Sequence, residues 1–352
     1  MSWFEHLIDK NSKVVKLCIE MSGNHQGSLE AARRFILEAP KNDQICLKFQ
    51  VYTPNTITME SENPDFLLPT DNDWSDFRSF YQLYKQAYTP WEWIEDLAAT
   101  CDSLNIPWFA SPFDHSAVAF LEQIGCQGYK IASPEITDTG LIETVAQTGK
   151  PMIISTGLAT WDDLDLAISC IRKQHNRFAI LKCTSAYPTP IEELNLLAIP
   201  AIRDRYDCAV GISDHTLSDT AAIVSVALGG TIVEKHYKLD DDVVSIDNHF
   251  SQPLGSANNF LGSLNEASQS RGVAELIITK SAIPSLNGRR SLYFERALSA
   301  GSLIEVDSIR SVRPSFGLHP KYLPNIVGKR LLVDVKKGDR VEASLIEGFD
   351  DD

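Results

Sequence analysis

Two histidines stand near the ends of apolar, strand-like runs in the second half of the chain. His215 lies in the run CAVGISDHT, and His236 lies in TIVEKHY, about one strand–helix unit later. Two neutral imidazoles with open coordination positions suit a divalent metal such as Mn²⁺, Zn²⁺ or Fe²⁺. Asp214 and Glu234, which lie one and two residues before them, are expected to orient these ligands or to bind metal-bound water. Two hydrogen-bonded histidines with a purely structural role are the alternative interpretation.

Two lysines occupy similar places in other apolar runs. Lys48 lies in QICLKFQVY and Lys130 lies in GYKIAS. A lysine in apolar surroundings is costly unless it meets an anion. These lysines therefore predict a site for a small, multiply charged anion, with a Schiff-base lysine as the competing use. Neighbouring run ends supply groups that donate to phosphate or carboxylate oxygens, namely Ser133, Ser155, Thr156, Gly157, Thr184 and Ser185.

Glu20 ends the first apolar run, just before the loop of IEMSGNHQG. Its carboxylate is a candidate for binding a hydroxyl or for moving a proton. His25 in the same loop is equally compatible with a structural and a functional role. Side chains two residues apart in a strand share a face. This spacing pairs Lys48 with Gln50, Ser213 with His215, and Glu234 with His236.

These side chains need elements that bring strand ends together. Eight short apolar runs alternate with longer amphipathic stretches over residues 1–282. Strands that alternate with helices form a parallel sheet, and eight such units are typical of a TIM (β/α)8 barrel. A doubly wound open sheet is the alternative, although no glycine-rich nucleotide loop follows the first run. In a TIM barrel the carboxyl ends of the strands carry the active site, where these polar residues fall.

Two regions depart from the regular alternation. The polar, aromatic-containing stretch 53–90 is longer than the other connections. We expect it to lie on the catalytic face and to shape the substrate pocket, with a plain surface excursion as the alternative. From Arg289 onward, short β-like runs are broken by Gly and Pro. We therefore expect an α/β barrel over residues 1–282 and a small, mostly irregular β domain over residues 283–352.

Composition narrows the class of protein. The net charge of −15 over 352 residues argues against nucleic acid or an anionic membrane as the main partner. None of the seven cysteines forms a CxxC pair, which is typical of buried thiols in a reducing compartment. No apolar signal segment opens the chain, and no run approaches the roughly 20 apolar residues that span a membrane. These features predict a cytoplasmic protein.

Several ordered motifs resemble the sialic acid synthase family. The segments IEMSGNHQG, LKFQVYTPNTIT, FASPFD, YKIAS, ISTGLAT, LKCTSAYPTP, GISDHT and EKHY occur in the family's order over residues 15–250. RPSFGLHPKYL, IVGKR and DVKKGD resemble its C-terminal antifreeze-like (SAF) domain, which has a β-clip fold. Within the family, YTPWEW, the ISDHT pattern and RPSFGLHP are most similar to the pseudaminic acid synthase branch. The N-acetylneuraminic and legionaminic acid synthases, which use other amino sugars, are the alternatives.

The resemblance implies an activity and a role for each site residue. The activity is the condensation of phosphoenolpyruvate with an amino-sugar aldehyde, with Mn²⁺ as the divalent metal and Mg²⁺ or Co²⁺ as alternatives. Metal ligands fall on His215 and His236. Catalytic roles fall on Glu20, Tyr187 and His236. Phosphoenolpyruvate contacts fall on Lys48, Lys130, Ser133, Ser155, Ser185 and Ser213. Sugar contacts fall on Gln50, Asp247 and Arg313, the last reaching in from the partner subunit of a domain-swapped homodimer.

One departure from the family pattern bears on the site. Ser185 stands where N-acetylneuraminic acid synthases usually carry Asn, which would reshape phosphate or substrate contacts. Two other classes of protein remain as alternatives. A metal-dependent hydrolase on the same fold usually opens with an HxH pair after its first strand, where this chain has only His25. The other is a sugar-binding barrel without activity, although every other expected site residue type is present.

Overall fold

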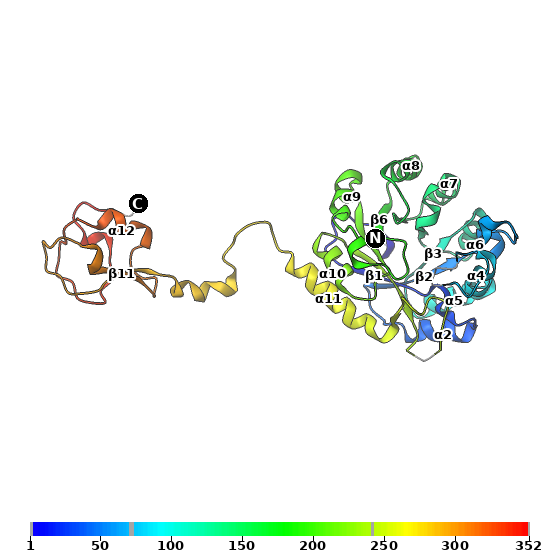
Figure 1. Ribbon diagram of the computed structural model, residues 1–352, viewed down its shortest axis with the longest axis horizontal. Coiled ribbons are helices and arrows are strands. Elements are labelled where there is room, and N and C mark those ends of the chain that lie inside the picture. Colours follow the sequence, from blue (N-terminus) through cyan, green and yellow to red (C-terminus); the bar gives the residue numbers. More distant parts are fainter. Residues whose placement is uncertain (1–2, 70–73, 241–242, 351–352) are drawn as a thin grey trace. The chain divides into compact units, whose positions relative to one another are not determined.

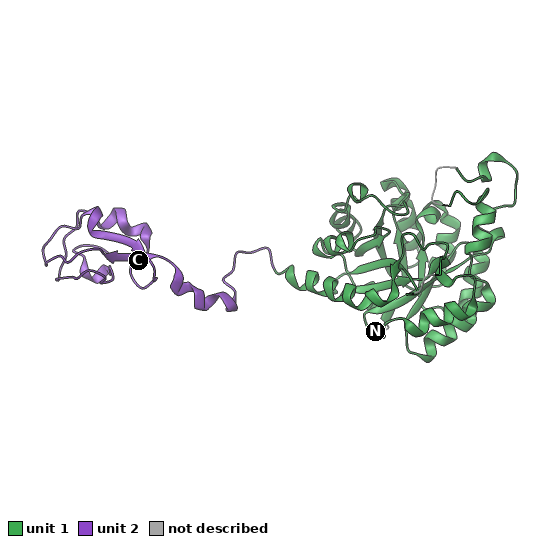
Figure 2. Cartoon of the chain, turned by 60° about the horizontal axis from the view of Figure 1, so that its bottom comes forward, with its two compact units in different colours: residues 1–272 green, residues 273–352 purple. Residues whose placement is uncertain are grey.

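The computed structural model of the protein describes residues 3–69, 74–240 and 243–350. The chain divides into two compact units, residues 1–272 and residues 273–352 (Figure 1, Figure 2). The sequence placed the boundary between residues 282 and 283, inside the second unit. Residues 273–285 are exposed throughout, so the packing of the first unit ends with its last helix, just before Gly272.

Eight parallel strands of the first unit close into a barrel, which confirms the predicted TIM-barrel fold. Each strand pairs with the next one along the chain, and the first strand also pairs with the eighth. Each of the eight apolar runs forms one of these strands. The strands are β1 (Lys16–Glu20), β2 (Ile45–Val51), β3 (Trp108–Pro112), β4 (Tyr129–Ile131), β5 (Met152–Ser155), β6 (Phe178–Cys183), β7 (Ala209–Asp214) and β8 (Ile232–Lys238), and the short β9 (Gln252–Pro253) extends the sheet beside β8.

Amphipathic helices cover the outside of the barrel (Figure 1). Capping side chains fix the first turns of several of them, because backbone N–H groups there have no partner within the helix. Asp114 accepts from the N–H of Ala117 at 3.0 Å, and Thr160 accepts from that of Asp163 at 3.2 Å. The helices are α1 (Trp3–Leu7), α2 (Leu29–Glu38), α3 (Pro54–Ile57), α4 (Phe80–Ala87), α5 (Trp91–Ser103), α6 (His115–Gln123), α7 (Thr139–Gln147), α8 (Trp161–Arg172), α9 (Ala198–Tyr206), α10 (Thr220–Ala227) and α11 (Ala257–Ser270).

The barrel interior is layered along its axis. At the amino-terminal end, Phe4 of α1 packs edge-on against Phe109 of β3, with ring centroids 5.8 Å apart. Cys18 and Cys46 lie in the same buried apolar cluster. Because side chains alternate along a strand, Cys18 and Glu20 share the inward face of β1. Apolar packing thus fills one end of the barrel, and the charged side chains gather toward the carboxyl ends of the strands.

The long connection 53–90 carries α3 and α4 and packs beside the mouth of the barrel. Residues 70–73 of this connection lie outside the described residues. Trp74 directly follows them, and its Nε1 donates to the carbonyl oxygen of Ile246 at 3.2 Å. The connection therefore contacts the segment that follows β8, at the end of the barrel where the polar residues gather.

The second unit has a small core of its own, built on short antiparallel pairings. Its regular elements are β10 (Ser291–Phe294), β11 (Ile309–Val312) and α12 (Leu323–Ile326). Leu292 and Phe294 of β10 are buried against Ile309 and Val341. Across both units, no helix of the described residues is long and apolar enough to cross a membrane.

Strands β7 and β8 approach each other closely at Gly211, and a substitution there tests this packing. A Cβ added to Gly211 of β7 would lie 1.8 Å from the carbonyl oxygen of Ile232 on the neighbouring β8. Backbone cannot move aside as a flexible side chain can. We therefore expect Gly211→Ala to lower the free energy of unfolding by about 3 kcal/mol or more, measured by chemical denaturation.

Gly262 provides the matched control. It lies within α11, and nothing lies within 4 Å of the position its Cβ would take. Since glycine weakens a helix interior, Gly262→Ala should raise stability by roughly 0.5–1 kcal/mol. Equal stabilities of the two variants would contradict the close β7–β8 approach.

Candidate active site

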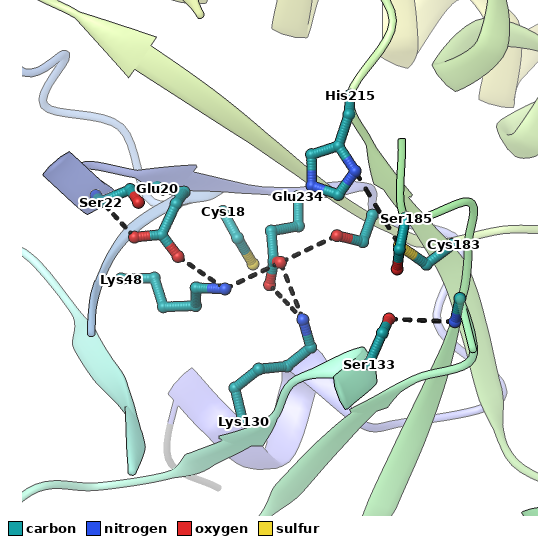
Figure 3. Close-up of polar contacts among 12 residues, drawn as sticks. Cys18, Glu20, Ser22, Lys48, Lys130, Ser133, Cys183, Ser185, His215 and Glu234 are labelled. Atoms are coloured by element: carbon teal, nitrogen blue, oxygen red, sulfur yellow. Dashed lines mark hydrogen bonds and ion pairs between the residues drawn. The ribbon is translucent and has the colours of Figure 1, made fainter. Parts of the chain in front are cut away.

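A buried carboxylate, that of Glu234 on β8, lies between two lysines inside the barrel (Figure 3). Its Oε1 lies 2.8 Å from Nζ of Lys48 on β2 and 2.8 Å from Nζ of Lys130 on β4. The hydroxyl of Ser213 on β7 donates to the same oxygen at 3.0 Å. Lys48 also pairs with Glu20 of β1, with Nζ and Oε2 2.6 Å apart. Two ammonium and two carboxylate groups therefore form a neutral buried network, the lysine–glutamate network.

The loop after β1 is fixed by Glu20 and by another buried carboxylate, that of Asp247. Glu20 Oε1 accepts from the backbone N–H of Ser22 at 2.8 Å, and Asp247 Oδ2 accepts from that of Gly23 at 3.0 Å. A side chain at Gly23 would collide with Ile246, whose Cγ2 lies 2.8 Å from the Cβ position. Glycine at this position thus lets the loop approach the segment that carries Asp247.

Charge pairing offsets the cost of burying this network. Burial lowers the pKa of Lys48 to about 8, although Glu234 opposes the shift. Burial alone would raise the pKa of Glu234, but Lys130 and Lys48 together hold it well below its ordinary value. An ammonium group has three donors, and the contacts described here use two on each lysine. These contacts therefore leave a donor on each lysine for a further acceptor.

Hydroxyl groups crowd around Gly157 at the ends of β4, β5 and β6. The backbone N–H of Gly157 donates to Ser133 Oγ at 3.0 Å. A Cβ at Gly157 would lie 2.1 Å from Ser185 Oγ and 2.8 Å from Ser133 Oγ, so only glycine fits between them. The hydroxyl of Ser155 is buried and has no hydrogen-bond partner in the described part of the chain. This group of donors, beside Lys130, forms a cradle suited to a small anion.

The two histidines face each other at the mouth of the barrel. The rings of His215 and His236 are 5.3 Å apart, and Tyr187 lies 4.5 Å from the ring of His215. His236 Nδ1 is buried and has no hydrogen-bond partner among the described atoms. Burial, together with His215, lowers the pKa of His236, so its ring is neutral at physiological pH. A neutral, unpartnered imidazole nitrogen beside a second imidazole is suited to binding a divalent metal.

Strand register brings most of the predicted site residues together. Residue pairing aligns Glu20 with Lys48 on one side and with His236 on the other. Gln50 lies two residues beyond Lys48 on β2 and shares its face. Arg313 lies in the second unit, where it is exposed and lines a shallow hollow with Arg289 and Arg290.

Three expectations about neighbouring polar residues need correction or completion. Asp214 does not support the histidines from behind, because it pairs with Lys235 at 2.7 Å on the other face of the sheet. Glu234 pairs with the two lysines and not with the histidines. His25 has the structural role of the two that the sequence allowed, since its Nε2 lies 3.2 Å from the carbonyl oxygen of Ala87 and its ring packs on Trp93.

Sequence reasoning missed Glu135, which follows Ser133 in the loop after β4. One of its carboxyl oxygens, Oε2, is buried and has no hydrogen-bond partner in the described part of the chain. Burial raises the pKa of Glu135 to about 7, and Asp138 adds to the shift. The sequence signal that could have identified Glu135 was its position two residues past Ser133, shortly after the end of β4. Such a carboxyl is suited to exchanging a proton near neutral pH.

Comparison with known proteins agrees with this geometry. The profile of the NeuB family matches residues 35–275, and that of the SAF domain matches residues 289–347. The chain belongs to the NeuB family. This NeuB-family chain is 36% identical to a pseudaminic acid synthase of Campylobacter jejuni, over 94% of this chain and 96% of that protein.

Two further comparisons place the chain within the NeuB family. It is 27% identical to an N,N'-diacetyllegionaminic acid synthase of Legionella pneumophila, over 91% of each protein. Its fold matches the crystal structure of an N-acetylneuraminic acid synthetase from Leptospira borgpetersenii in complex with citrate, with a TM-score of 0.68 and 28% identity. That match covers 78% of this chain and 90% of the other.

Glu135 gives the stability of the protein a specific pH dependence. Its pKa in the folded protein is about 7, against 4.5 ordinarily, so the folded state binds the proton more tightly than the unfolded state. Stability from this group is complete below about pH 4.5 and is lost as pH rises through 7. Between pH 4.5 and 7, the free energy of unfolding of the wild-type protein should therefore fall by up to about 3 kcal/mol relative to that of Glu135→Gln.

Chemical denaturation of both proteins at intervals from pH 4.5 to 8 measures this difference. Glu30→Gln, at an exposed position on α2, is the control for a general effect of removing one carboxylate. A constant difference between wild type and Glu135→Gln across this range would show that Glu135 titrates normally.

Proposed function

We propose that this protein is a pseudaminic acid synthase. It condenses phosphoenolpyruvate with 2,4-diacetamido-2,4,6-trideoxy-altrose and releases phosphate. The observation that carries the proposal is the lysine–glutamate network, which is accompanied in the same barrel by the hydroxyl cradle around Gly157 and the paired histidines. The identity to the pseudaminic acid synthase of Campylobacter jejuni supports the choice of sugar.

Different site residues contact phosphoenolpyruvate and the amino sugar. Lys48 and Lys130 each direct an N–H toward phosphoenolpyruvate, and Ser133, Ser155 and Ser185 donate to its phosphate and carboxylate oxygens. Carbon 3 of phosphoenolpyruvate attacks the sugar aldehyde, so the enol electron pair forms the new carbon–carbon bond while the C=O π pair moves to the aldehyde oxygen, which takes up a proton. Positive charge then develops at carbon 2, where water adds and loses a proton. The resulting tetrahedral carbon collapses to a ketone and expels phosphate by C–O cleavage. Buried carboxylates nearby, such as Glu234, stabilise this charge because they are already fixed in place.

His215 and His236 would hold a divalent metal, for which we propose Mn²⁺. The unpartnered Nδ1 of His236 and its neutral ring fit this role. Among the described residues, no third His, Cys, Asp or Glu joins them to complete a metal cluster. Oxygen atoms of water and sugar would therefore fill the remaining positions. Such a metal supplies Lewis acidity toward the aldehyde oxygen.

The second unit is proposed to complete the site of a partner subunit. Arg313 is exposed in this unit and forms no ion pair with a carboxylate among the described residues. Exposed, unpaired guanidinium groups suit recognition of a polar ligand. In a domain-swapped homodimer, Arg313 of each chain would contact the sugar in the barrel of the other.

One assay tests the proposed function and its alternatives. The protein is incubated with phosphoenolpyruvate, Mn²⁺ and one amino sugar at a time, and the acid formed is identified by mass. We expect phosphate release to require both substrates and to be fastest with the diacetamido sugar. Faster turnover of N-acetylmannosamine, or of the sugar leading to legionaminic acid, would assign the chain to another branch. Sugar binding without phosphate release would indicate a non-catalytic protein.

His236→Ala should reduce the rate most among the histidine variants. His236 adjoins both the metal position and the sugar position, so its loss removes an electrostatic group that acts during the reaction. We expect kcat to fall by at least about 100-fold, measured as phosphate release at saturating substrates. His6→Ala, at an exposed position on α1, should keep wild-type activity. Near-normal turnover by His236→Ala would exclude the assignment of this histidine.

Subunit complementation tests the shared site. A dimer of Arg313→Ala with His236→Ala would contain one site with both defects and one with neither. Random mixing of the two inactive variants should therefore restore roughly a quarter of the wild-type rate. Lys48→Ala mixed with His236→Ala is the control, because both defects lie in the barrel and every site keeps one. No recovery with Arg313→Ala would contradict a contribution from the partner.

A further inference from the structure

Three aromatic side chains from separate segments meet beside the paired histidines. They are Trp74 of the long connection, Tyr187 after β6 and Phe250 just before β9, and we call them the aromatic wall. Phe250 lies at its centre, with its ring 5.2 Å from Tyr187 and 6.4 Å from Trp74. Trp74 and Tyr187 are 5.7 Å apart. Each of the three rings therefore contacts the other two.

The aromatic wall borders the histidines directly. The ring of Phe250 lies 4.8 Å from His236 and 6.0 Å from His215, and Tyr187 lies 4.5 Å from His215. The lysine–glutamate network lies deeper in the barrel, since Glu234 shares the face of His236 on β8 and comes two residues before it. The histidines thus have charged groups below them and aromatic rings beside them.

The polar atoms of the aromatic wall are engaged elsewhere. Trp74 Nε1 donates to the carbonyl oxygen of Ile246 at 3.2 Å, so the indole N–H already has an acceptor. The hydroxyl of Tyr187 interacts with Ser185, on the side of the hydroxyl cradle. Phe250 has no polar atom and is only 2% exposed, so it supports the rings around it from behind. The ring of His249 also packs on Trp74 and Phe250, at 5.5 and 4.9 Å. A ligand that reaches Trp74 therefore meets the carbon face of its indole, where a hydroxyl would lose its hydrogen bonds to water without replacement.

We infer that Trp74, held in place by Phe250 behind it, determines which sugar is accepted, by packing against a deoxygenated terminal carbon. This inference rests on the proposed function, because the reacting aldehyde must lie at the histidines and the lysine–glutamate network. The acetamido groups need hydrogen-bond partners, which the wall does not offer and which Gln50 and Asp247 do. A terminal methyl group needs none, so it is the part of an amino sugar that fits an apolar surface. A hydroxymethyl group in its place is disfavoured.

Two amino sugars that differ only at the terminal carbon test this inference. One is the diacetamido sugar with a terminal methyl group, and the other carries a hydroxymethyl group there. An added hydroxyl in an apolar pocket reduces kcat/KM by on the order of 100-fold, which is the preference we expect of the wild-type enzyme. Trp74→Ala should reduce this preference about 10-fold, mainly by raising KM for the methyl sugar, with KM for phosphoenolpyruvate unchanged.

Two further variants separate the apolar surface from a structural role. Trp74→Phe keeps the aromatic face but loses the N–H that binds Ile246, so it should retain most of the preference. Trp3→Ala is the matched control, because Trp3 is also half-buried and its Nε1 also donates to a backbone carbonyl, that of Asp43. Trp3 lies on α1 at the opposite end of the barrel, so its loss should leave the preference unchanged.

The outcomes distinguish this inference from the proposed function. If the wild-type enzyme converts neither sugar, the proposed function fails. If it converts the methyl sugar but Trp74→Ala keeps the full preference, the aromatic wall does not determine the choice of sugar. Equal losses for both sugars in Trp74→Ala and Trp74→Phe would indicate that Trp74 only anchors the segment after β8, and this would also overturn the inference.

Discussion

The pairing of Glu234 with Lys48 and Lys130 is the interaction on which the rest of the site depends. Isolated charges inside a barrel would be prohibitively costly without nearby groups of opposite sign. Glu234 and Glu20 balance the two ammonium groups, so the network is neutral and both lysines can keep a donor for an incoming anion. Its members come from β1, β2, β4 and β8, so the network exists only when the barrel is closed.

The closed barrel also places hydroxyl, imidazole and aromatic side chains in separate regions of its mouth. Hydroxyls and the close backbone approach at Gly157 lie at the ends of β4, β5 and β6, where a phosphate is best accommodated. The histidines stand at β7 and β8, with the charged network below them and the aromatic wall beside them. This arrangement lets two substrates of opposite character, a small anion and a largely neutral sugar, meet at one pair of imidazoles. The long connection contributes Trp74, so the least regular part of the first unit contacts the site.

The second unit has a different physical role. Its core is small and its arginines at positions 289, 290 and 313 are exposed, although Arg290 also donates to the carbonyl oxygen of Ser311 at 2.9 Å. A separate folded unit can present such side chains to another chain without disturbing the barrel. Sharing a site between subunits would couple activity to assembly, since neither chain alone would hold every sugar contact.

The sequence by itself determined the order of the barrel strands and most site residues. Strands buried on both faces appear as continuous apolar runs, so Lys48, Lys130 and His236 stood out within them. Only the tertiary structure decided their partners. Glu234 was assigned to the histidines because it lies near them in sequence, yet strand register places it between lysines far away in the chain. The position of Trp74 against Phe250 and the burial that raises the pKa of Glu135 have the same cause: they arise from contacts between distant segments, which local sequence patterns do not specify.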